Sequence, residues 1–393
     1  MRKLIMVWMV AIFVTSAWAQ ETLPRNDVKD QREGAYAFTN ATIVADYQTD
    51  FINGLMLIRD GKIEYVGISK AIPAGYTTID LSGKRIYPSL IDVYSNYGQP
   101  KVERTRRTRN SPEQFMSKTD GAYNANQSIK AEYSAAENFT IDAKKAKEMR
   151  GLGFGAANTF RADGIARGTS AFVTLGEDSD NNVLLNDQAA AHYSFNTGSS
   201  TQVYPRSAMG YIALLRQTYL DASWYGSQNP RPFKDQTLER WITTQSLPQI
   251  FDTRGYLAVL RADKVGDEFG VQYIIKGSGD EYKRLSLIKA TGASMIIPLN
   301  FPDANEVEDP IAALDVSLAD MKHWELAPSN LARLSTGGVN FAITSAGLDK
   351  SSQFWPNLRK AIKNGLSEQE ALKALTYTPA RMVKVDGSVG SLA

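Results

Sequence analysis

The hydrophobic pattern of residues 37–81 predicts a small antiparallel sheet. Short apolar runs alternate with polar positions, and the pairs Asn53-Gly54 and Asp60-Gly61 separate these runs. An Asn-Gly or Asp-Gly pair between apolar runs is a strong hairpin signal, because these residues accept the positive φ angles of a tight turn. We therefore expect a β-rich region that closes at residues 82–84.

From residue 87 onward, short apolar runs alternate with stretches of helical periodicity. This alternation is typical of a parallel α/β sheet or barrel. The expected strands are residues 90–94, 154–159, 170–175, 248–252, 271–276, 294–299 and 339–344. The expected helices are residues 141–150, 256–269, 281–291, 354–364 and 368–375, the last opened by a capping box at Ser367 and Glu370. Residues 99–126 and 176–204 are expected to be long loops around the site face of a barrel.

The first nineteen residues have the three-part pattern of a secretory signal. Arg2 and Lys3 form a charged start, residues 4–14 are apolar, and residues 17–19 form a small-x-small cleavage site. The apolar run is too short to cross a bilayer stably. We expect export to the periplasm or the exterior, with no membrane attachment after cleavage. The alternative is an anchor that the protein retains.

Composition narrows the chemistry that is available. Apolar residues make up 43% and charged residues 22% of the 393-residue chain, which is ordinary for a globular protein. The formal net charge of +2 gives no electrostatic case for a nucleic-acid partner. The chain has no cysteine, which excludes disulfides, thiolate catalysis and iron–sulfur clusters. It has only two histidines, His192 and His323, so an imidazole-rich metal site is out of reach.

Two sequence blocks together carry a family likeness. One is NGLMLIRDGKIEYVGI with IDLSGKRIYPSLIDVYSNYG, and the other is GGVNFAITSAG with FWPNLRKAIKNGLSEQEALKALTYTPARMVKVDGSVGSLA. This pattern resembles the metal-dependent amidohydrolase superfamily, near its imidazolonepropionase-like and exported bacterial members. The resemblance implies an α/β protein: a TIM-like (β/α)8 barrel with a small β-sandwich built from the chain ends.

The resemblance also implies a domain arrangement. The expected parts are a signal peptide at 1–19, the N-terminal part of the sandwich at 20–88, the barrel at 89–380 and the start of the C-terminal return to the sandwich at 381–393. Because the family pattern stops just as this return begins, we expect the C-terminal part of the sandwich to be truncated here. A longer natural product, with a second amidohydrolase-like module, or another chain would then supply the missing strands.

The metal ligands that the family pattern requires are replaced in this sequence. The family uses zinc or another divalent metal to activate water for attack on a carbon–nitrogen bond. Its first strand ends in Asp-x-His-x-His, its fifth and sixth strands each offer a His, and an Asp follows its eighth strand. The residues at the corresponding ligand positions here, which would form a degenerate pocket, are Tyr94, Asn96, Asp252, Lys276, Ser345 and Ala346. Phenol, amide, ammonium and methyl groups are poor ligands for such ions, so we expect no metal, no cofactor and no catalytic residue.

The two histidines do not repair this site in the sequence. His192 lies in the expected loop 176–204, and His323 lies in a helix-like stretch, so neither sits at an expected strand end. A surface or packing role is the simpler interpretation of both.

Two functions remain open. The first is an exported amidohydrolase-like protein without metal-dependent catalysis, a binding or partner module. Its partners would be a small-molecule ligand, a second amidohydrolase module or a second copy of the chain. The alternative is a hydrolase of non-peptide carbon–nitrogen bonds with an atypical mechanism or with a second module beyond this chain. Lys276 and Asp252 would then supply a base and an electrostatic clamp.

Overall fold

The computed structural model describes residues 34–103, 111–113 and 116–392. The chain divides into two compact units, one of residues 1–43 with 52–84 and one of residues 44–51 with 85–393. The expected signal peptide, residues 1–19, lies outside the described residues. No helix among the described residues is long and apolar enough to cross a membrane.

The first unit is built on a sheet with the strand order β3-β2-β1-β4. Its strands are β1 (Ala35–Val44), β2 (Asp50–Arg59), β3 (Lys62–Gly67) and β4 (Thr77–Asp80), and a short β5 (Arg85–Ile86) follows. Strands β2 and β3 form the expected antiparallel hairpin, and Asp60 and Gly61 at its turn both have positive φ angles, 50° and 74°. The prediction of a turn at Asn53-Gly54 is wrong, because both residues lie inside β2. The sheet is also not wholly antiparallel, since β1 pairs with β4 in parallel.

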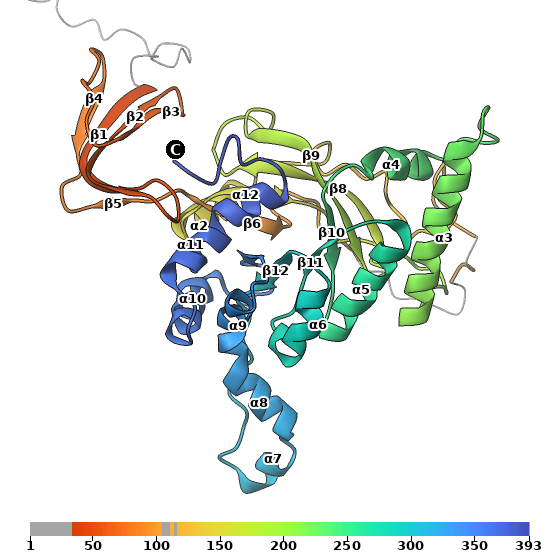
Figure 1. The fold of residues 1–393 in the computed structure, drawn as a ribbon. Coiled ribbons are helices and arrows are strands. Elements are labelled where there is room, and N and C mark those ends of the chain that lie inside the picture. The colour runs from red at the N-terminus through yellow and green to blue at the C-terminus, as the bar shows by residue number, and fades with distance from the viewer. Residues whose placement is uncertain (1–33, 104–110, 114–115, 393) are drawn as a thin grey trace, which may run out of the picture. The chain divides into compact units, whose positions relative to one another are not determined.

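The second unit contains an eight-stranded sheet with the order β13-β12-β11-β10-β9-β8-β7-β6 (Figure 1). Its strands are β6 (Leu90–Ser95), β7 (Phe154–Thr159), β8 (Ala166–Thr174), β9 (Leu184–Ser194), β10 (Gln249–Asp252), β11 (Ile274–Lys276), β12 (Met295–Pro298) and β13 (Phe341–Thr344). The first and last strands meet: the Thr344 hydroxyl donates to the Asp92 carboxylate at 2.6 Å and to the Tyr94 carbonyl at 3.2 Å. The sheet is therefore a nearly closed barrel.

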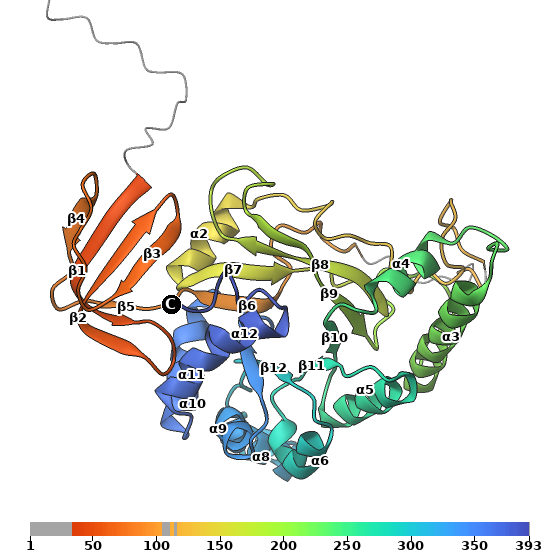
Figure 2. The ribbon, with the colours of Figure 1, turned by 45° about the horizontal axis from the view of Figure 1, so that its top comes forward.

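The barrel departs from a regular (β/α)8 pattern at β7, β8 and β9, which lie side by side in Figure 2. Strand β8 runs antiparallel to both neighbours, whereas the other described neighbours pair in parallel. Strand β9 lies within residues 176–204, so the prediction of one long loop there is wrong. Its sequence LLNDQAAAHYS places polar residues and three alanines in the strand, and this composition gives a weak β signal.

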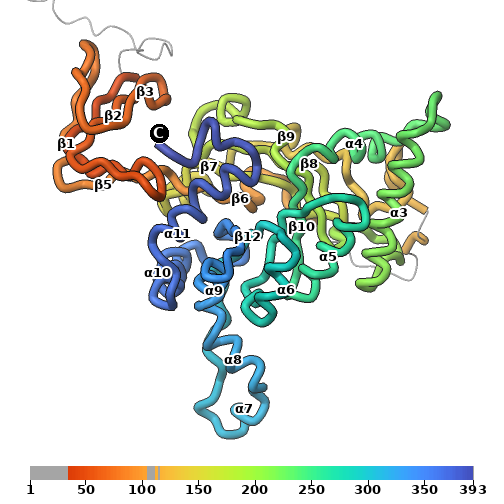
Figure 3. The backbone as a smooth tube through the Cα atoms, in the orientation of Figure 1, coloured from red at the N-terminus to blue at the C-terminus, as the bar shows by residue number. Residues whose placement is uncertain are grey.

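Helices pack around the strands, as the smooth tube in Figure 3 shows. They are α2 (Ala143–Gly151), α3 (Ala208–Ser227), α4 (Gln236–Thr244), α5 (Tyr256–Phe269), α6 (Leu285–Ala290), α7 (Pro310–Leu314), α8 (Leu318–Leu326), α9 (Asn330–Thr336), α10 (Phe354–Lys363), α11 (Glu368–Leu375) and α12 (Tyr377–Met382). The bounds predicted for α5 and α11 are confirmed. The Ser367 hydroxyl caps α11 by accepting from the Glu370 amide at 3.1 Å. The helix predicted over 281–291 begins as a 3-10 turn (Glu281–Arg284) before α6.

The core of the second unit has two layers. A smaller cluster, which includes Ile91, Val93, Phe172 and Ile250, fills the barrel interior, and a larger one lies between the strands and the helices. Because the smaller cluster fills the barrel interior, it gives rigid support to the side chains at the strand ends. Helices α7 and α8 differ from the other helices, because none of their residues is buried and they extend away from the barrel (Figures 1 and 3).

Candidate functional site

Two of the residues from the family ligand positions meet where neighbouring strands end. Asp252 is the last residue of β10 and Lys276 is the last residue of β11, and the two are paired in register. This register brings the Lys276 ammonium within 3.3 Å of the Asp252 carboxylate oxygen Oδ1. The side chains are 17% and 21% exposed, so this ion pair is largely shielded from water.

Arg167 of β8 completes the arrangement from the other side. Its Nη1 atom lies 3.2 Å from Asp252 Oδ2 and donates to the Tyr94 hydroxyl at 3.0 Å. The guanidinium is only 4% exposed. We call Tyr94, Arg167, Asp252 and Lys276 the mouth cluster. Arg167 is not among the residues predicted from the sequence, although an arginine inside the largely apolar run GIARGTSAFV is a signal of a buried charge that needs a partner.

The charges of the mouth cluster fix the ionisation of its carboxylate. Burial by itself would raise the pKa of Asp252, but the positive charges of Arg167 and Lys276 outweigh burial and hold the pKa below its usual value. Asp252 is therefore an anion with a cation on each oxygen. The cluster carries two positive charges and one negative charge, which is a net positive charge.

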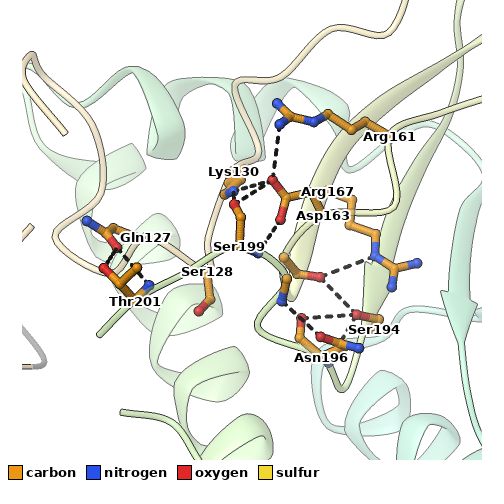
Figure 4. Close-up of polar contacts among 12 residues, drawn as sticks. Gln127, Ser128, Lys130, Arg161, Asp163, Arg167, Ser194, Asn196, Ser199 and Thr201 are labelled. Atoms are coloured by element: carbon orange, nitrogen blue, oxygen red, sulfur yellow. Dashed lines mark hydrogen bonds and ion pairs between the residues drawn. The ribbon is translucent and has the colours of Figure 1, made fainter. Parts of the chain in front are cut away.

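A polar network holds Arg167 in place (Figure 4). The Gly164 carbonyl accepts both from Arg167 Nε at 3.2 Å and from the Ser194 hydroxyl at 2.8 Å. The Asp163 carboxylate next to it binds the Lys130 ammonium at 2.5 Å and accepts from the Ser199 amide at 2.6 Å. These contacts tie the turn before β8 to the segment after β9, so the guanidinium has little freedom to move.

Gly168 adds a backbone constraint directly after Arg167. Its φ angle is 74°, and a Cβ atom there would lie 1.9 Å from the Tyr133 carbonyl oxygen. Only glycine fits such a close approach of two backbones. The position of Arg167 along β8 is therefore fixed by the fold as well as by its hydrogen bonds.

A second carboxylate, Asp92, lies at the junction of β6 and β13 and has only neutral partners among the described residues. It accepts from the Ser345 hydroxyl at 2.5 Å, the Thr344 hydroxyl at 2.6 Å and the Tyr94 amide at 3.2 Å. Asp92 is 1% exposed, and burial raises its pKa, which these hydrogen bonds offset only in part. Ser345 thus supports Asp92 and does not reach the mouth cluster.

The remaining two residues from the ligand positions lie elsewhere. Asn96 is exposed beyond the end of β6, where it lines a separate cavity of 700 Å³ that also contains Asp142. Ala346 packs against the barrel interior, and its amide donates to the Thr344 hydroxyl at 3.0 Å. The structure thus unites Tyr94, Asp252 and Lys276 but leaves Asn96 apart.

The histidines have packing roles in the structure. His192 lies in β9 and not in a loop; it is 1% exposed and stacks on Phe160 with ring centroids 3.9 Å apart. Burial lowers the pKa of His192 well below its usual value, and the charge of Arg167 lowers it further. Neither ring nitrogen has a hydrogen-bond partner among the described residues. His323 lies on α8, where its Nδ1 atom is 3.0 Å from the Tyr282 hydroxyl.

Comparison with known proteins identifies the scaffold. No protein-family model and no curated protein sequence matches this chain. Among solved structures, an amidohydrolase from Thermotoga maritima MSB8 is similar at 17% identity and a TM-score of 0.67, covering 91% of both chains. A second structure described as an amidohydrolase has 13% identity and a TM-score of 0.50, covering 91% of this chain and 89% of that one. The chain has the amidohydrolase fold.

On this amidohydrolase fold, the mouth cluster does not suit a divalent metal. Both oxygens of Asp252 are engaged by cations, at 3.2 Å and 3.3 Å, and a dication there would meet the charges of Arg167 and Lys276. No three His, Cys, Asp or Glu side chains of the described chain lie close enough together to hold a metal ion. His192 is a single imidazole beside a guanidinium. These residues therefore do not fit the metal that the resemblance implies.

Proposed function

We propose that this chain is a binding or partner module on an amidohydrolase fold, without metal-dependent hydrolysis of its own. One observation carries the proposal: Arg167 and Lys276 occupy the two oxygens of Asp252, where the fold would need a metal ligand. Metal-assisted hydrolysis requires a dication that polarises water and the scissile group. A guanidinium and an ammonium can orient and bind an anion, but they do not generate a hydroxide in this way.

The alternative, an atypical metal-free hydrolase, is less well supported by the geometry. A lysine that acts as a general base must be neutral with a free lone pair, whereas the Lys276 nitrogen forms an ion pair with Asp252 at 3.3 Å. Asp252 is a weak base, because the neighbouring cations hold its pKa below the usual value. The mouth cluster is therefore better suited to recognition than to proton abstraction.

The wider arrangement of the protein is part of the same proposal. We infer that residues 1–19 direct export to the periplasm or exterior, that 20–88 and 381–393 belong to the small sandwich and that 89–380 belong to the (β/α)8-type barrel. A second amidohydrolase module or a second copy of the chain would be the macromolecular partner. A barrel without its own metal chemistry is easily retained beside a competent one, where it serves as a structural partner.

The decisive test is metal content combined with activity. Purified protein incubated with zinc, manganese or cobalt and then desalted should retain well under one equivalent by elemental analysis. It should not hydrolyse hydantoin, lactam, dipeptide or imidazolone substrates. Near-stoichiometric metal that is lost in the Asp252→Asn variant, together with turnover, would overturn the proposal. Metal that persists in Asp252→Asn would locate the ion away from the mouth cluster.

A further inference from the structure

A cavity of 310 Å³ adjoins the mouth cluster where β9 and β10 end. Six of its lining residues present polar groups: Ser194, Asn196, Tyr211, Asp252, Arg254 and Arg261. Phe195 and Ile212 add an apolar wall. A cavity of this size is at the small end of the range for ligand sites, about the volume that an amino-acid-sized molecule needs.

The cavity has an excess of positive charge. Arg254 and Arg261 make no ion pair and no side-chain hydrogen bond within the described part of the chain. The one carboxylate in the lining is Asp252, and its oxygens already contact Arg167 and Lys276. Four cations thus surround or adjoin a space that holds a single anion.

Resting on the proposed binding function, we propose that this cavity binds a small organic carboxylate that has no free ammonium group, such as a dicarboxylate or an N-acyl amino acid. The planar guanidinium groups of Arg254 and Arg261 match the two oxygens of a carboxylate. A free ammonium group is disfavoured, because the one carboxylate in the lining already contacts two cations and the ammonium would meet their positive charge. The apolar wall accommodates a short hydrocarbon body.

The polar end of β9 is organised to contribute a further donor. The Asn196 amide N–H donates to the Ser194 hydroxyl at 3.1 Å, and the Asn196 side-chain oxygen accepts from the Gly198 amide at 2.9 Å. The hydrogen bond from Gly198 holds the oxygen of the Asn196 side chain and so fixes the orientation of its amide group (Figure 4). Its Nδ2 group has no acceptor within the described residues and is free to donate to a ligand oxygen. Because the same Ser194 hydroxyl bonds Gly164, this donor is coupled to the network that fixes Arg167.

Calorimetric titration of the chain in the presence of a chelator tests the inference. Succinate and N-acetylalanine are the probes, and N-acetylalanine amide and alanine are matched controls that lack the charge or carry a free ammonium. Both carboxylates should bind with a Kd of about 1 mM or better. Each control should bind at least about tenfold more weakly, since a charged hydrogen-bond pair is lost or a cation is added.

Variants locate the binding. Arg254→Gln and Arg261→Gln should each weaken succinate binding about tenfold, whereas Arg359→Gln, which removes an exposed arginine on α10 outside this cavity, should leave it unchanged. Circular dichroism of each variant checks that the fold is retained. The inference is overturned if neither carboxylate binds, if the neutral amide binds equally well, or if a double variant that combines Arg254→Gln with Arg261→Gln binds as tightly as the parent.

Three outcomes show which proposal has failed. Inorganic phosphate that competes fully with succinate and binds more tightly would show a general oxyanion site and reject the organic carboxylate. Carboxylate binding that appears only after stoichiometric zinc loading would instead refute the proposed metal-free function. A metal-free protein that binds no carboxylate would refute this inference alone.

Discussion

Asp92 and Asp252 both lie in strands of the same barrel, and both are largely buried, but they have different partners. Asp92 accepts hydrogen bonds from the neutral groups of Ser345, Thr344 and the Tyr94 backbone. Asp252 lies between two cations, Arg167 and Lys276. Burial raises the pKa of Asp92, whereas the two cations lower the pKa of Asp252 in spite of burial.

This difference shows that the charge of the partners decides in which direction the pKa of a largely buried carboxylate shifts. Neutral donors stabilise a carboxylate less than a full charge does, so they offset only part of the cost of desolvation. The same difference distinguishes two sides of the barrel. On the neutral side, the junction of β6 and β13, the donors to Asp92 are uncharged. On the charged side, the mouth at β8, β10 and β11, the partners of Asp252 are cations. A ligand with a negative group is therefore expected at the charged side.

The largest expected effect on stability comes from breaking the ion pair between Arg167 and Asp252. Arg167→Met should lower the free energy of unfolding by about 3–5 kcal/mol, because it leaves the buried Asp252 with one cation fewer. The substitution also removes the donors to the Tyr94 hydroxyl and the Gly164 carbonyl. Urea denaturation at neutral pH measures the loss.

Two companion variants sharpen this measurement. Lys276→Met should cost less, about 1–3 kcal/mol, because Asp252 keeps Arg167 and the lysine is the more exposed partner. Combining Arg167→Met with Asp252→Leu should recover part of the loss, since no unpaired charge remains. A loss below about 1 kcal/mol for Arg167→Met would show that the pair contributes little to folding.

The two carboxylates should also respond to pH in opposite directions. The lowered pKa of Asp252 means that its contribution to stability is present above the unfolded pKa and disappears as the pH falls through the folded pKa. The raised pKa of Asp92 means that its contribution is present at low pH and declines as the pH rises from the unfolded towards the folded pKa. The predicted effect is smaller than that of Arg167→Met.

Matched Asp→Asn variants test this opposition by urea denaturation from about pH 2.5 to about pH 7. The advantage of the parent over Asp252→Asn should grow as the pH rises. Its advantage over Asp92→Asn should shrink over the same interval. Other titrating groups are shared by parent and variant, so they cancel in each difference. Parallel curves for the two variants would contradict opposite pKa shifts.

On the charged side, the position of a strand was predictable from the sequence where the strand is a short apolar run, as in QIFD of β10. Lys276 and Asp252 were placed at a pocket through the family resemblance, and the register of β10 and β11 brings them together. Arg167 was missed because its strand was predicted to begin only at residue 170. Its partners lie 73 and 85 residues away along the chain, and only barrel closure brings them into contact.

On the neutral side, the sequence pointed to the residues but not to the contact between them. Asp92 and Ser345 both lie in the sequence blocks that carry the family resemblance, yet nothing in the sequence indicated that their side chains form a hydrogen bond across 253 residues. Strand β9 and its His192 were assigned to a loop, because alanines and polar residues conceal a buried strand. Local propensity therefore predicted many of the elements but not β9, whereas contacts between distant strands determined the site.

The smallest expected effect concerns one neutral donor to Asp92. Ser345→Ala removes the 2.5 Å hydrogen bond but leaves the Thr344 hydroxyl in place. The free energy of unfolding should fall by about 1 kcal/mol at neutral pH, the usual value for one such bond. The pKa of Asp92 should rise further, because a donor that stabilises the ionised form is lost. Carbon-detected NMR titration of the Asp92 carboxyl measures this shift. Ser345→Thr keeps the hydroxyl and should move the pKa less. Equal shifts in the two variants would mean that burial alone, without this donor, sets the ionisation of the neutral side.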